Sequence, residues 1–201
     1  MNPIHAALFD FGGVLAEEGF SQGLHRIARN NRHDPEAFFA AAARIVYECG
    51  YVTGATDEGG FWSALRALYP LRENDGELSG LILDLFLPRP AMLDLVSEMR
   101  AAGIRAAILS DQSDWLDRLE ARHHFFHLFD QVFNSFHLGK SKKDPTLFAD
   151  IRKRFGCVPA ATLFVDDNPG HIARARSQGF LTHLFTDIPS CQAACRALLP
   201  T

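Results

Sequence analysis

The sequence of 201 residues lacks several features that mark particular protein classes. It has no long basic run, and 24 acidic against 20 basic side chains give a net charge of −4, so nucleic acid is not expected as a principal partner. No apolar stretch approaches the ~18 residues of a membrane-spanning helix. Residues 1–5 carry neither the basic nor the apolar segment of a secretory signal. We therefore expect no nucleic-acid partner and no membrane partner.

Cysteine is also scarce. The four cysteines, at positions 49, 157, 191 and 195, do not have the spacing of a zinc site. Cys191 and Cys195 could share one helix face, but two thiols rarely make a metal site. Scattered cysteines are typical of reduced thiols, so we expect a cytoplasmic protein.

What the sequence does contain is organised around its first apolar run, residues 6–9. Asp10 follows directly, and Gly12 and Gly13 come almost at once. This pattern predicts a buried strand over residues 5–10 that ends at a tight turn. In an open α/β sheet, ligands bind at the carboxyl ends of strands, so Asp10 is a candidate site residue. Taken alone, the stretch is more typical of a solvated turn aspartate than of a site residue.

Residues 17–87 have helical patterning and no convincing strand. An aspartate precedes Pro35, which suits an N-cap followed by proline at the first helical position. Glycines interrupt the segment in its middle. We interpret it as a small all-helical insertion. The predicted helices cover residues 21–31, 35–48, 57–68 and 75–87.

After residue 88 the pattern alternates between helix and strand. Helices are predicted over residues 91–102, 113–122, 144–156, 168–179 and 189–199. Strands are predicted over residues 104–109, 131–135, 162–165 and 180–185. Strands that alternate with helices imply a parallel sheet with helices on both faces. The predicted fold class is therefore α/β.

Polar side chains gather at the predicted strand ends. Asp10, Ser110 and the pair Asp166 and Asp167 end three strands, and Lys142 lies in the loop after another. In a parallel sheet these loops open on one edge, so the side chains can converge. Three carboxylates repel one another unless a cation neutralises them. Hard oxygen ligands favour Mg²⁺.

The same groups suit a phosphate ester. Lys142 and Ser110 would hold phosphate oxygens, and the backbone N–H groups of Phe11 and Asp111 would add an anion-binding nest. An oxygen of Asp10 would attack phosphorus, because carboxylates can act as nucleophiles that form an aspartyl-phosphate. We therefore expect a small phosphorylated metabolite as the substrate.

These motifs together resemble the haloacid dehalogenase-like (HAD) hydrolase superfamily, in the subgroup with a helical cap. The matching stretches are residues 10–14 (Asp-Phe-Gly-Gly-Val), Ser110 after an apolar strand, Lys142 two residues before the aspartate of an Asp-Pro pair, and residues 164–168 (Phe-Val-Asp-Asp-Asn). The resemblance implies a Rossmann-like core of residues 1–16 and 88–201. It also implies a cap of residues 17–87 that closes over the site and excludes water.

By the same resemblance, the chain is a phosphatase with Asp10 as the nucleophile. Mg²⁺ would be held by Asp10, the backbone carbonyl of Gly12 and the aspartate pair, with Asp167 favoured over Asp166 as the direct ligand. Each assignment has an ordinary structural alternative. The aspartate pair suits the first turn of a helix, whose dipole favours acids, and Ser110 suits an N-cap.

Two other groups of residues are interpreted as structural. Three histidines, at positions 123, 124 and 127, have helical spacing but no acid or thiol to complete a metal set. Cap aromatics at positions 20, 51, 61 and 62 are candidates for the pocket wall, but we expect most of them to be packing.

One position departs from the family pattern. Phosphatases of this superfamily usually have a second aspartate two residues after the nucleophile, which protonates the leaving oxygen and then activates water; here that position is Gly12. General acid–base catalysis is typically worth ~10²–10⁴-fold. We therefore expect a preference for good leaving groups, as in aryl phosphates or sugar 1-phosphates.

Two other functions stay open. Haloacid dehalogenation displaces halide with a carboxylate and needs neither a leaving-group acid nor a metal. That chemistry suits Gly12, but the paired Asp166 and Asp167 speak against it. The third interpretation is a low-turnover binding or regulatory protein on the same fold, which only the missing acid supports.

Overall fold

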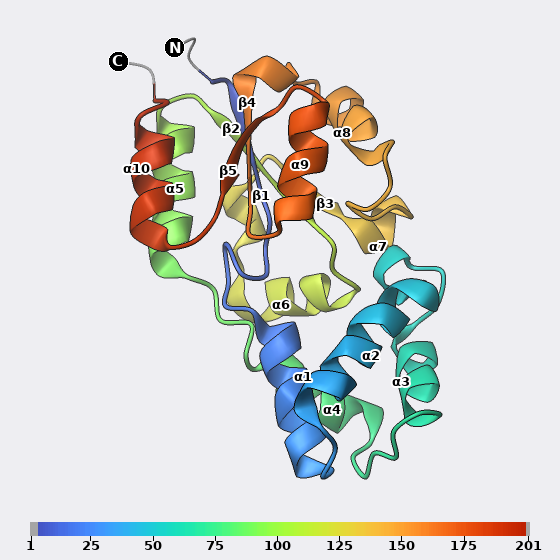
Figure 1. Ribbon diagram of the computed structural model, residues 1–201. Helices are drawn as coiled ribbons and strands as arrows, with labels where there is room; N and C mark the ends of the chain where they lie inside the picture. The colour runs from blue at the N-terminus through green and yellow to red at the C-terminus, as the bar shows by residue number, and fades with distance from the viewer. Residues whose placement is uncertain (1–3, 200–201) are drawn as a thin grey trace.

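The structure is a computed structural model that describes residues 4–199 and contains a parallel sheet of five strands (Figure 1). The strands are β1 (Ala6–Phe9), β2 (Arg105–Ser110), β3 (Gln131–Asn134), β4 (Thr162–Asp166) and β5 (Leu181–Leu184). Their order across the sheet is β3-β2-β1-β4-β5, which puts β1 in the centre. The predicted α/β, Rossmann-like fold is confirmed.

Helices cover both faces of the sheet. The helices that follow the cap segment are α5 (Pro90–Ala101), α6 (Trp115–His123), α7 (Ser135–Leu138), α8 (Leu147–Phe155), α9 (Pro169–Ser177) and α10 (Ile188–Arg196), with short 3-10 helices η2 (Phe126–Leu128) and η3 (Pro159–Ala161). The pair α5 and α10 packs on one face, and α8 and α9 pack on the other (Figure 1). Among residues 4–199, no helix is both long and apolar enough to cross a membrane.

The central strand, β1, lies between two hydrophobic clusters, which explains its unbroken apolar sequence. Ala7 and Phe9 belong to the hydrophobic cluster on one face, and Ala6 and Leu8 belong to the cluster on the other. A strand covered on both faces is apolar at every position instead of alternating. The short helix α7 was not predicted, because four residues are too few to show a helical period.

The cap segment forms four α-helices at one end of the sheet (Figure 1). They are α1 (Gly19–Asn30), α2 (Pro35–Glu48), α3 (Glu58–Arg66) and α4 (Asp75–Leu83), with the 3-10 helix η1 (Tyr51–Thr53) between α2 and α3. The side chains of Asp34, Asp57 and Asn74 cap three of them by accepting backbone N–H bonds in the first turn. The four predicted helices are confirmed, although the last ends four residues early, at Leu83.

The cap packs on the core through a continuous hydrophobic cluster. Tyr51, Phe61 and Trp62 are fully buried and pack around Trp115 of α6. Trp115 Nε1 also donates a hydrogen bond to Glu58 Oε1 of the cap at 2.6 Å. These contacts hold the cap beside the carboxyl edge of the sheet. The domain boundaries at 16/17 and 87/88 stay a prediction.

Candidate active site

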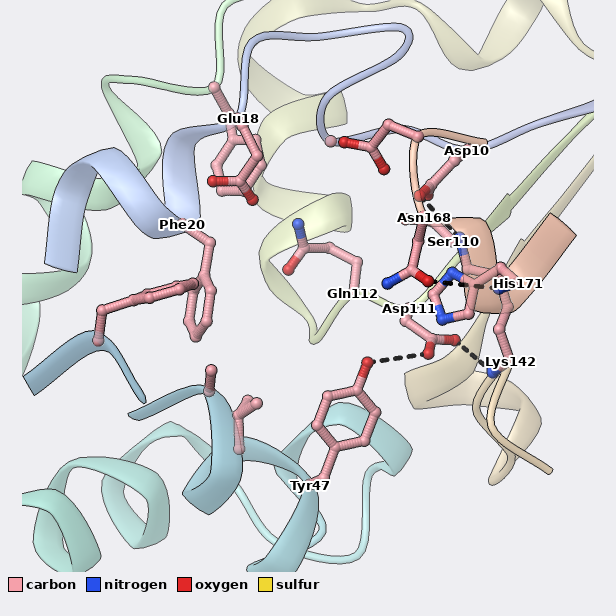
Figure 2. Close-up of a pocket in the computed structure, with 16 residues that line it drawn as sticks. Asp10, Glu18, Phe20, Tyr47, Ser110, Asp111, Gln112, Lys142, Asn168 and His171 are labelled. Carbon is pink, nitrogen blue, oxygen red and sulfur yellow. Dashed lines mark hydrogen bonds and ion pairs between the residues drawn. The ribbon is translucent and has the colours of Figure 1, made fainter. Parts of the chain in front are cut away.

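A cavity of about 270 Å³ opens between the carboxyl ends of the strands and the cap helices α1 and α2 (Figure 2). Asp10, Ser110 and Lys142 line it from the core side. Phe20 of α1 and Tyr47 of α2 line it from the cap side. Of the residues that were expected to converge, Asp10, Ser110, Lys142 and Asp167 line this cavity, and Asp166 does not.

The register of the sheet brings Asp10 level with Asp166. Phe9 of β1 pairs with Val165 of β4, and the Asp10 N–H donates to the Val165 carbonyl at 2.9 Å. The next residue along each strand is an aspartate. Adjacent parallel strands lie about 5 Å apart, so the two carboxylates share one small volume.

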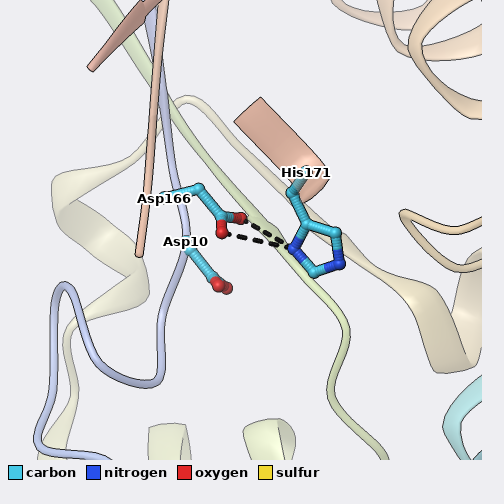
Figure 3. Close-up of side chains that lie close together, drawn as sticks. All are labelled: Asp10, Asp166 and His171. Carbon is cyan, nitrogen blue, oxygen red and sulfur yellow. Dashed lines mark hydrogen bonds and ion pairs between the residues drawn. The ribbon is translucent and has the colours of Figure 1, made fainter. Parts of the chain in front are cut away.

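Lys142 bridges these two carboxylates. Its side chain is fully buried, and its Nζ lies 2.7 Å from Asp10 Oδ2 and 2.6 Å from Asp166 Oδ2. The His171 ring reaches Asp166 from α9, with Nδ1 3.2 Å from both carboxylate oxygens (Figure 3). Potential ligand atoms of Asp10, Asp166 and His171 lie within 4.8 Å of one another, but Asp166 is already paired with Lys142.

Burial and charge act in opposite directions on these groups. Burial raises the pKa of Asp10 to about 8, although Lys142 opposes the increase. Burial also favours neutral Asp166, but Lys142 and His171 outweigh it and lower the Asp166 pKa to about 2. Burial disfavours charged Lys142, yet the two carboxylates outweigh it and raise its pKa. Lys142 and Asp166 therefore stay ionised and paired, and Asp10 is the carboxyl that tends to keep a proton.

Asp167 has different surroundings from Asp166. Asp166 is fully buried, whereas Asp167 lines the cavity. Gly13, with φ +81°, lies against Asp167, and a Cβ at Gly13 would be 2.2 Å from Asp167 Oδ2. Only glycine fits this turn without displacing the carboxylate. The cavity is thus accessible to Asp167 and closed to Asp166.

The donor set fits a hard divalent cation. The site holds three carboxyl groups, those of Asp10, Asp166 and Asp167, and the fully buried Lys142 pairs with the first two. Burial, together with the charge of Asp166, raises the pKa of Asp167. Gly12 lines the same cavity. Carboxylate and backbone carbonyl oxygens are the ligands that Mg²⁺ prefers, and its charge would offset the excess of acids.

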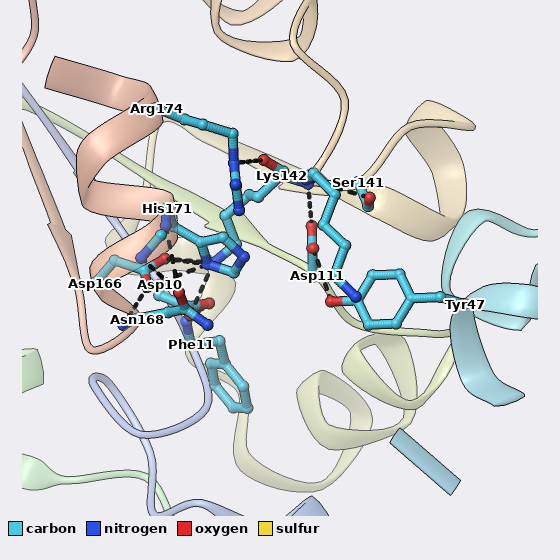
Figure 4. A network of polar contacts seen from close by, with 12 residues as sticks. Asp10, Phe11, Tyr47, Asp111, Ser141, Lys142, Asp166, Asn168, His171 and Arg174 are labelled. Atoms are coloured by element: carbon cyan, nitrogen blue, oxygen red, sulfur yellow. Dashed lines mark hydrogen bonds and ion pairs between the residues drawn. The ribbon is translucent and has the colours of Figure 1, made fainter. Parts of the chain in front are cut away.

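Asp111 joins the cap to the loop that carries Lys142. Its Oδ1 accepts the Lys142 N–H at 2.6 Å, and its Oδ2 accepts the Tyr47 hydroxyl at 3.0 Å (Figure 4). Arg174 Nε donates to the Lys142 carbonyl at 2.7 Å and holds the loop from the side of α9. The Asp111 side chain thus links Tyr47 of the cap to the loop that carries Lys142.

The neighbouring lysines and the clustered histidines lie elsewhere. Lys140 pairs with Asp150 at 2.6 Å on the surface, and Lys143 Nζ lies 3.2 Å from the centre of the Tyr47 ring. Lys142 differs from both in being buried against Asp10. The three histidines at 123, 124 and 127 are exposed. Of the four cap aromatics considered, Phe20 lines the cavity and the other three are buried in packing.

Several cavity residues were missed by the sequence reasoning: Glu18, Tyr47, Gln112, Asn168 and His171. A signal for His171 was present, because it lies in the first turn of a helix that follows a strand-end acid, and side chains there lean back toward the helix start. Tyr47 and Glu18 had no such signal. They reach the site from the cap, whose docking does not follow from chain order.

A family model described as haloacid dehalogenase-like hydrolase matches residues 4–179. The chain belongs to the haloacid dehalogenase-like hydrolases. No protein among the curated sequences matches it significantly. The match includes the aspartate at the end of β1, the lysine and the aspartate pair described above.

Solved structures with a similar fold include an enzyme crystallised with magnesium and phosphate and also a dehalogenase. The HAD family enzyme BT-2542 from Bacteroides thetaiotaomicron, in complex with magnesium and inorganic phosphate, is 18% identical, with 91% of this chain and 94% of that chain covered and a TM-score of 0.72. A HAD-like family hydrolase from Porphyromonas gingivalis is 22% identical over 96% and 98%, with a TM-score of 0.70. L-2-haloacid dehalogenase from Xanthobacter autotrophicus, with chloropropionic acid covalently bound, is 21% identical over 89% and 76%, with a TM-score of 0.66.

Proposed function

We propose that this HAD hydrolase cleaves small phosphomonoesters, sugar 1-phosphates among them, in a Mg²⁺-dependent reaction through an aspartyl-phosphate on Asp10. The observation that carries the proposal is the position of Asp10 at the cavity, held by Lys142 and accompanied by Ser110 and Asp167. The cavity of about 270 Å³ is near the lower end of the ~300–1,000 Å³ common for ligand pockets. It therefore suits a small phosphorylated metabolite.

Asp10 is oriented for attack. The Phe11 N–H donates to its Oδ1 at 2.7 Å, and Lys142 Nζ lies 2.7 Å from its Oδ2. Attack on phosphorus would transfer the phosphoryl group to one Asp10 oxygen and release the alcohol. The Phe11 N–H, which was expected in the phosphate nest, donates to Asp10 in this structure, and its contact with phosphate stays a prediction.

The remaining groups would hold the phosphate. Lys142 Nζ has three N–H donors, and two of them serve Asp10 and Asp166, which leaves one for a phosphate oxygen. Within residues 4–199 no protein group bonds to the Ser110 hydroxyl, which lines the cavity. The backbone N–H of Asp111 follows Ser110 and would complete this side of the nest.

Asp10, the carbonyl of Gly12 and Asp167 would hold Mg²⁺, because all three residues line the cavity. Asp166 would stay paired with Lys142. When bound, the ion would neutralise the excess acid charge and polarise a phosphate oxygen. The similarity of fold to BT-2542, which was crystallised with magnesium and phosphate, supports this proposal.

Dehalogenation is the second candidate. Its support is Gly12, which supplies no leaving-group acid, and the similarity of fold to the Xanthobacter dehalogenase. The accumulation of acids around Asp10 argues against it, because displacement of halide by a carboxylate gains nothing from a metal-binding set. A low-turnover binding protein is the third candidate, and Gly12 again is its support.

The test combines two assays with one control. Phosphate release from p-nitrophenyl phosphate is measured with Mg²⁺ and with EDTA, and halide release is measured from 2-chloropropionate. Metal-dependent phosphate release that is lost in Asp10→Asn supports the phosphatase. Metal-independent halide release would select the dehalogenase, and turnover in neither assay would select the binding protein.

A further inference from the structure

Position 12 lacks an acid, but another carboxyl lies close to it. A Cβ placed on Gly12 would be 3.1 Å from the Phe86 ring and 3.9 Å from Glu18 Oε1. Glu18 thus brings a carboxyl oxygen close to where an acidic side chain at position 12 would start. Glu18 also points into the cavity that Asp10 lines (Figure 2).

Local structure fixes Glu18 in this position. Glu18 is the N-cap of α1, and its Oε2 accepts the Ser21 N–H at 2.6 Å. Gly19 lets the chain pass close to Phe86, since a Cβ there would be 2.6 Å from the Phe86 ring. One carboxyl oxygen is therefore held by the helix. Among residues 4–199, the other has no hydrogen-bond partner and faces Gly12.

We propose that Glu18 is the general acid–base residue of this site and does the work of the carboxyl that Gly12 lacks. The proposal rests on the phosphatase function proposed above. A carboxyl from the cap would then complete a catalytic set whose other members come from the core.

The proposed reaction has two chemical steps, the formation and the hydrolysis of an aspartyl-phosphate. An Asp10 oxygen forms a bond to phosphorus while the bond from phosphorus to the leaving oxygen breaks, and the proton on Glu18 Oε1 passes to that oxygen. Ionised Glu18 then takes a proton from water as the water oxygen attacks the phosphoryl group. The bond between phosphorus and Asp10 breaks, phosphate leaves, and both residues return to their starting states.

The electrostatic environment of Glu18 favours this role. Burial raises the pKa of its carboxyl, the Ser21 N–H opposes the increase, and the charge of Asp167 adds to it. A raised pKa brings a carboxylic acid closer to the pH at which donating and accepting a proton are balanced. A glutamate carboxyl exposed to water would be ionised at neutral pH.

The proposal changes the expected substrate range. Without a proton donor, the rate should fall steeply as the leaving group becomes more basic, which is the preference expected from Gly12 alone. With Glu18 as the donor, the wild-type enzyme should show a shallow dependence and should accept alkyl phosphates as well.

The test uses p-nitrophenyl, phenyl and p-methoxyphenyl phosphate, which differ in leaving-group basicity more than in shape. Glu18→Gln keeps an oxygen acceptor for the Ser21 N–H but has no proton to transfer. We expect kcat/KM for phenyl phosphate to fall by about 10²-fold, and for p-nitrophenyl phosphate by less than about tenfold. Phosphorylated enzyme should also accumulate, seen by intact-protein mass spectrometry, because the second step loses its base.

Two controls make the outcomes distinct. Glu36→Gln makes the same change at a carboxyl whose side chain is 84% exposed and should leave the leaving-group dependence unchanged. Glu18→Asp keeps a carboxyl and should recover part of the phenyl phosphate rate. Equal losses on all three esters, or no loss, would overturn the role of Glu18. No phosphate release by the wild-type enzyme would overturn the phosphatase function itself.

Discussion

Replacing Lys142 with methionine tests how the charges of the site are balanced. Lys142 is fully buried, with Nζ between Asp10 and Asp166 at 2.7 and 2.6 Å. Methionine keeps most of the unbranched stem and removes the charge with its three donors. Lys142→Met would leave two buried carboxyl groups facing each other without the cation that separates them.

The expected cost follows from this geometry. Removing one partner of a buried ion pair typically destabilises a protein by about 3–5 kcal/mol. Asp10 would avoid part of the cost by taking up a proton, because burial already raises its pKa to about 8. Asp166 depends more on Lys142, which lowers its pKa. We therefore expect a loss of about 3 kcal/mol, at the low end of that range.

Urea unfolding followed by circular dichroism measures this loss. Wild type, Lys142→Met, Asp166→Asn and the double variant are compared at neutral pH in EDTA. The double variant should be more stable than Lys142→Met alone, since it also removes the carboxylate that depends most on the lysine. A loss below about 1 kcal/mol, the value of an exposed pair, or a double variant no more stable than the single one, would refute the reasoning.

In EDTA, stability should fall as pH rises from about 4 to 8, because folded Asp10 keeps a proton that the unfolded chain releases; Mg²⁺ should raise the melting temperature most near pH 8. Gly13→Ala should cost about 1–2 kcal/mol from its positive φ and, by displacing Asp167, raise the Mg²⁺ concentration needed for half-maximal activity. Tyr47→Phe should lower the free energy of unfolding by about 1 kcal/mol, because the hydrogen bond to Asp111 is lost. It should also raise KM more than it lowers kcat. Each of these predictions is wrong if the stated change leaves the measured stability, Mg²⁺ dependence or kinetic constant unchanged.

The core of the site could be predicted from sequence because its parts lie at strand ends. An apolar run that ends in Asp10, and another that ends in Asp166, are local patterns, and a parallel sheet then aligns them. Lys142 was found through its spacing from an Asp-Pro pair, and the structure buries it against both aspartates. For these residues, the local sequence pattern and the parallel topology of the sheet predict the same position in the fold.

The cap side of the site could not be predicted in this way. Glu18 and Tyr47 reach the cavity only because the cap docks through buried aromatics such as Trp62 against Trp115. That docking depends on side-chain packing between segments far apart in the chain, which periodicity does not encode. The sequence also does not show which of Asp166 and Asp167 is buried, because that depends on which of them pairs with Lys142.

The most direct test of the central claim is to locate the phosphoryl group on the protein. The enzyme is mixed with p-nitrophenyl phosphate and Mg²⁺, quenched in acid within the first turnover, digested and mapped by mass spectrometry. We expect a phosphorylated peptide that contains Asp10, formed with Mg²⁺, lost in EDTA and absent from Asp10→Asn. Phosphate release without a phosphorylated peptide, or a phosphoryl group on any other residue, would contradict it.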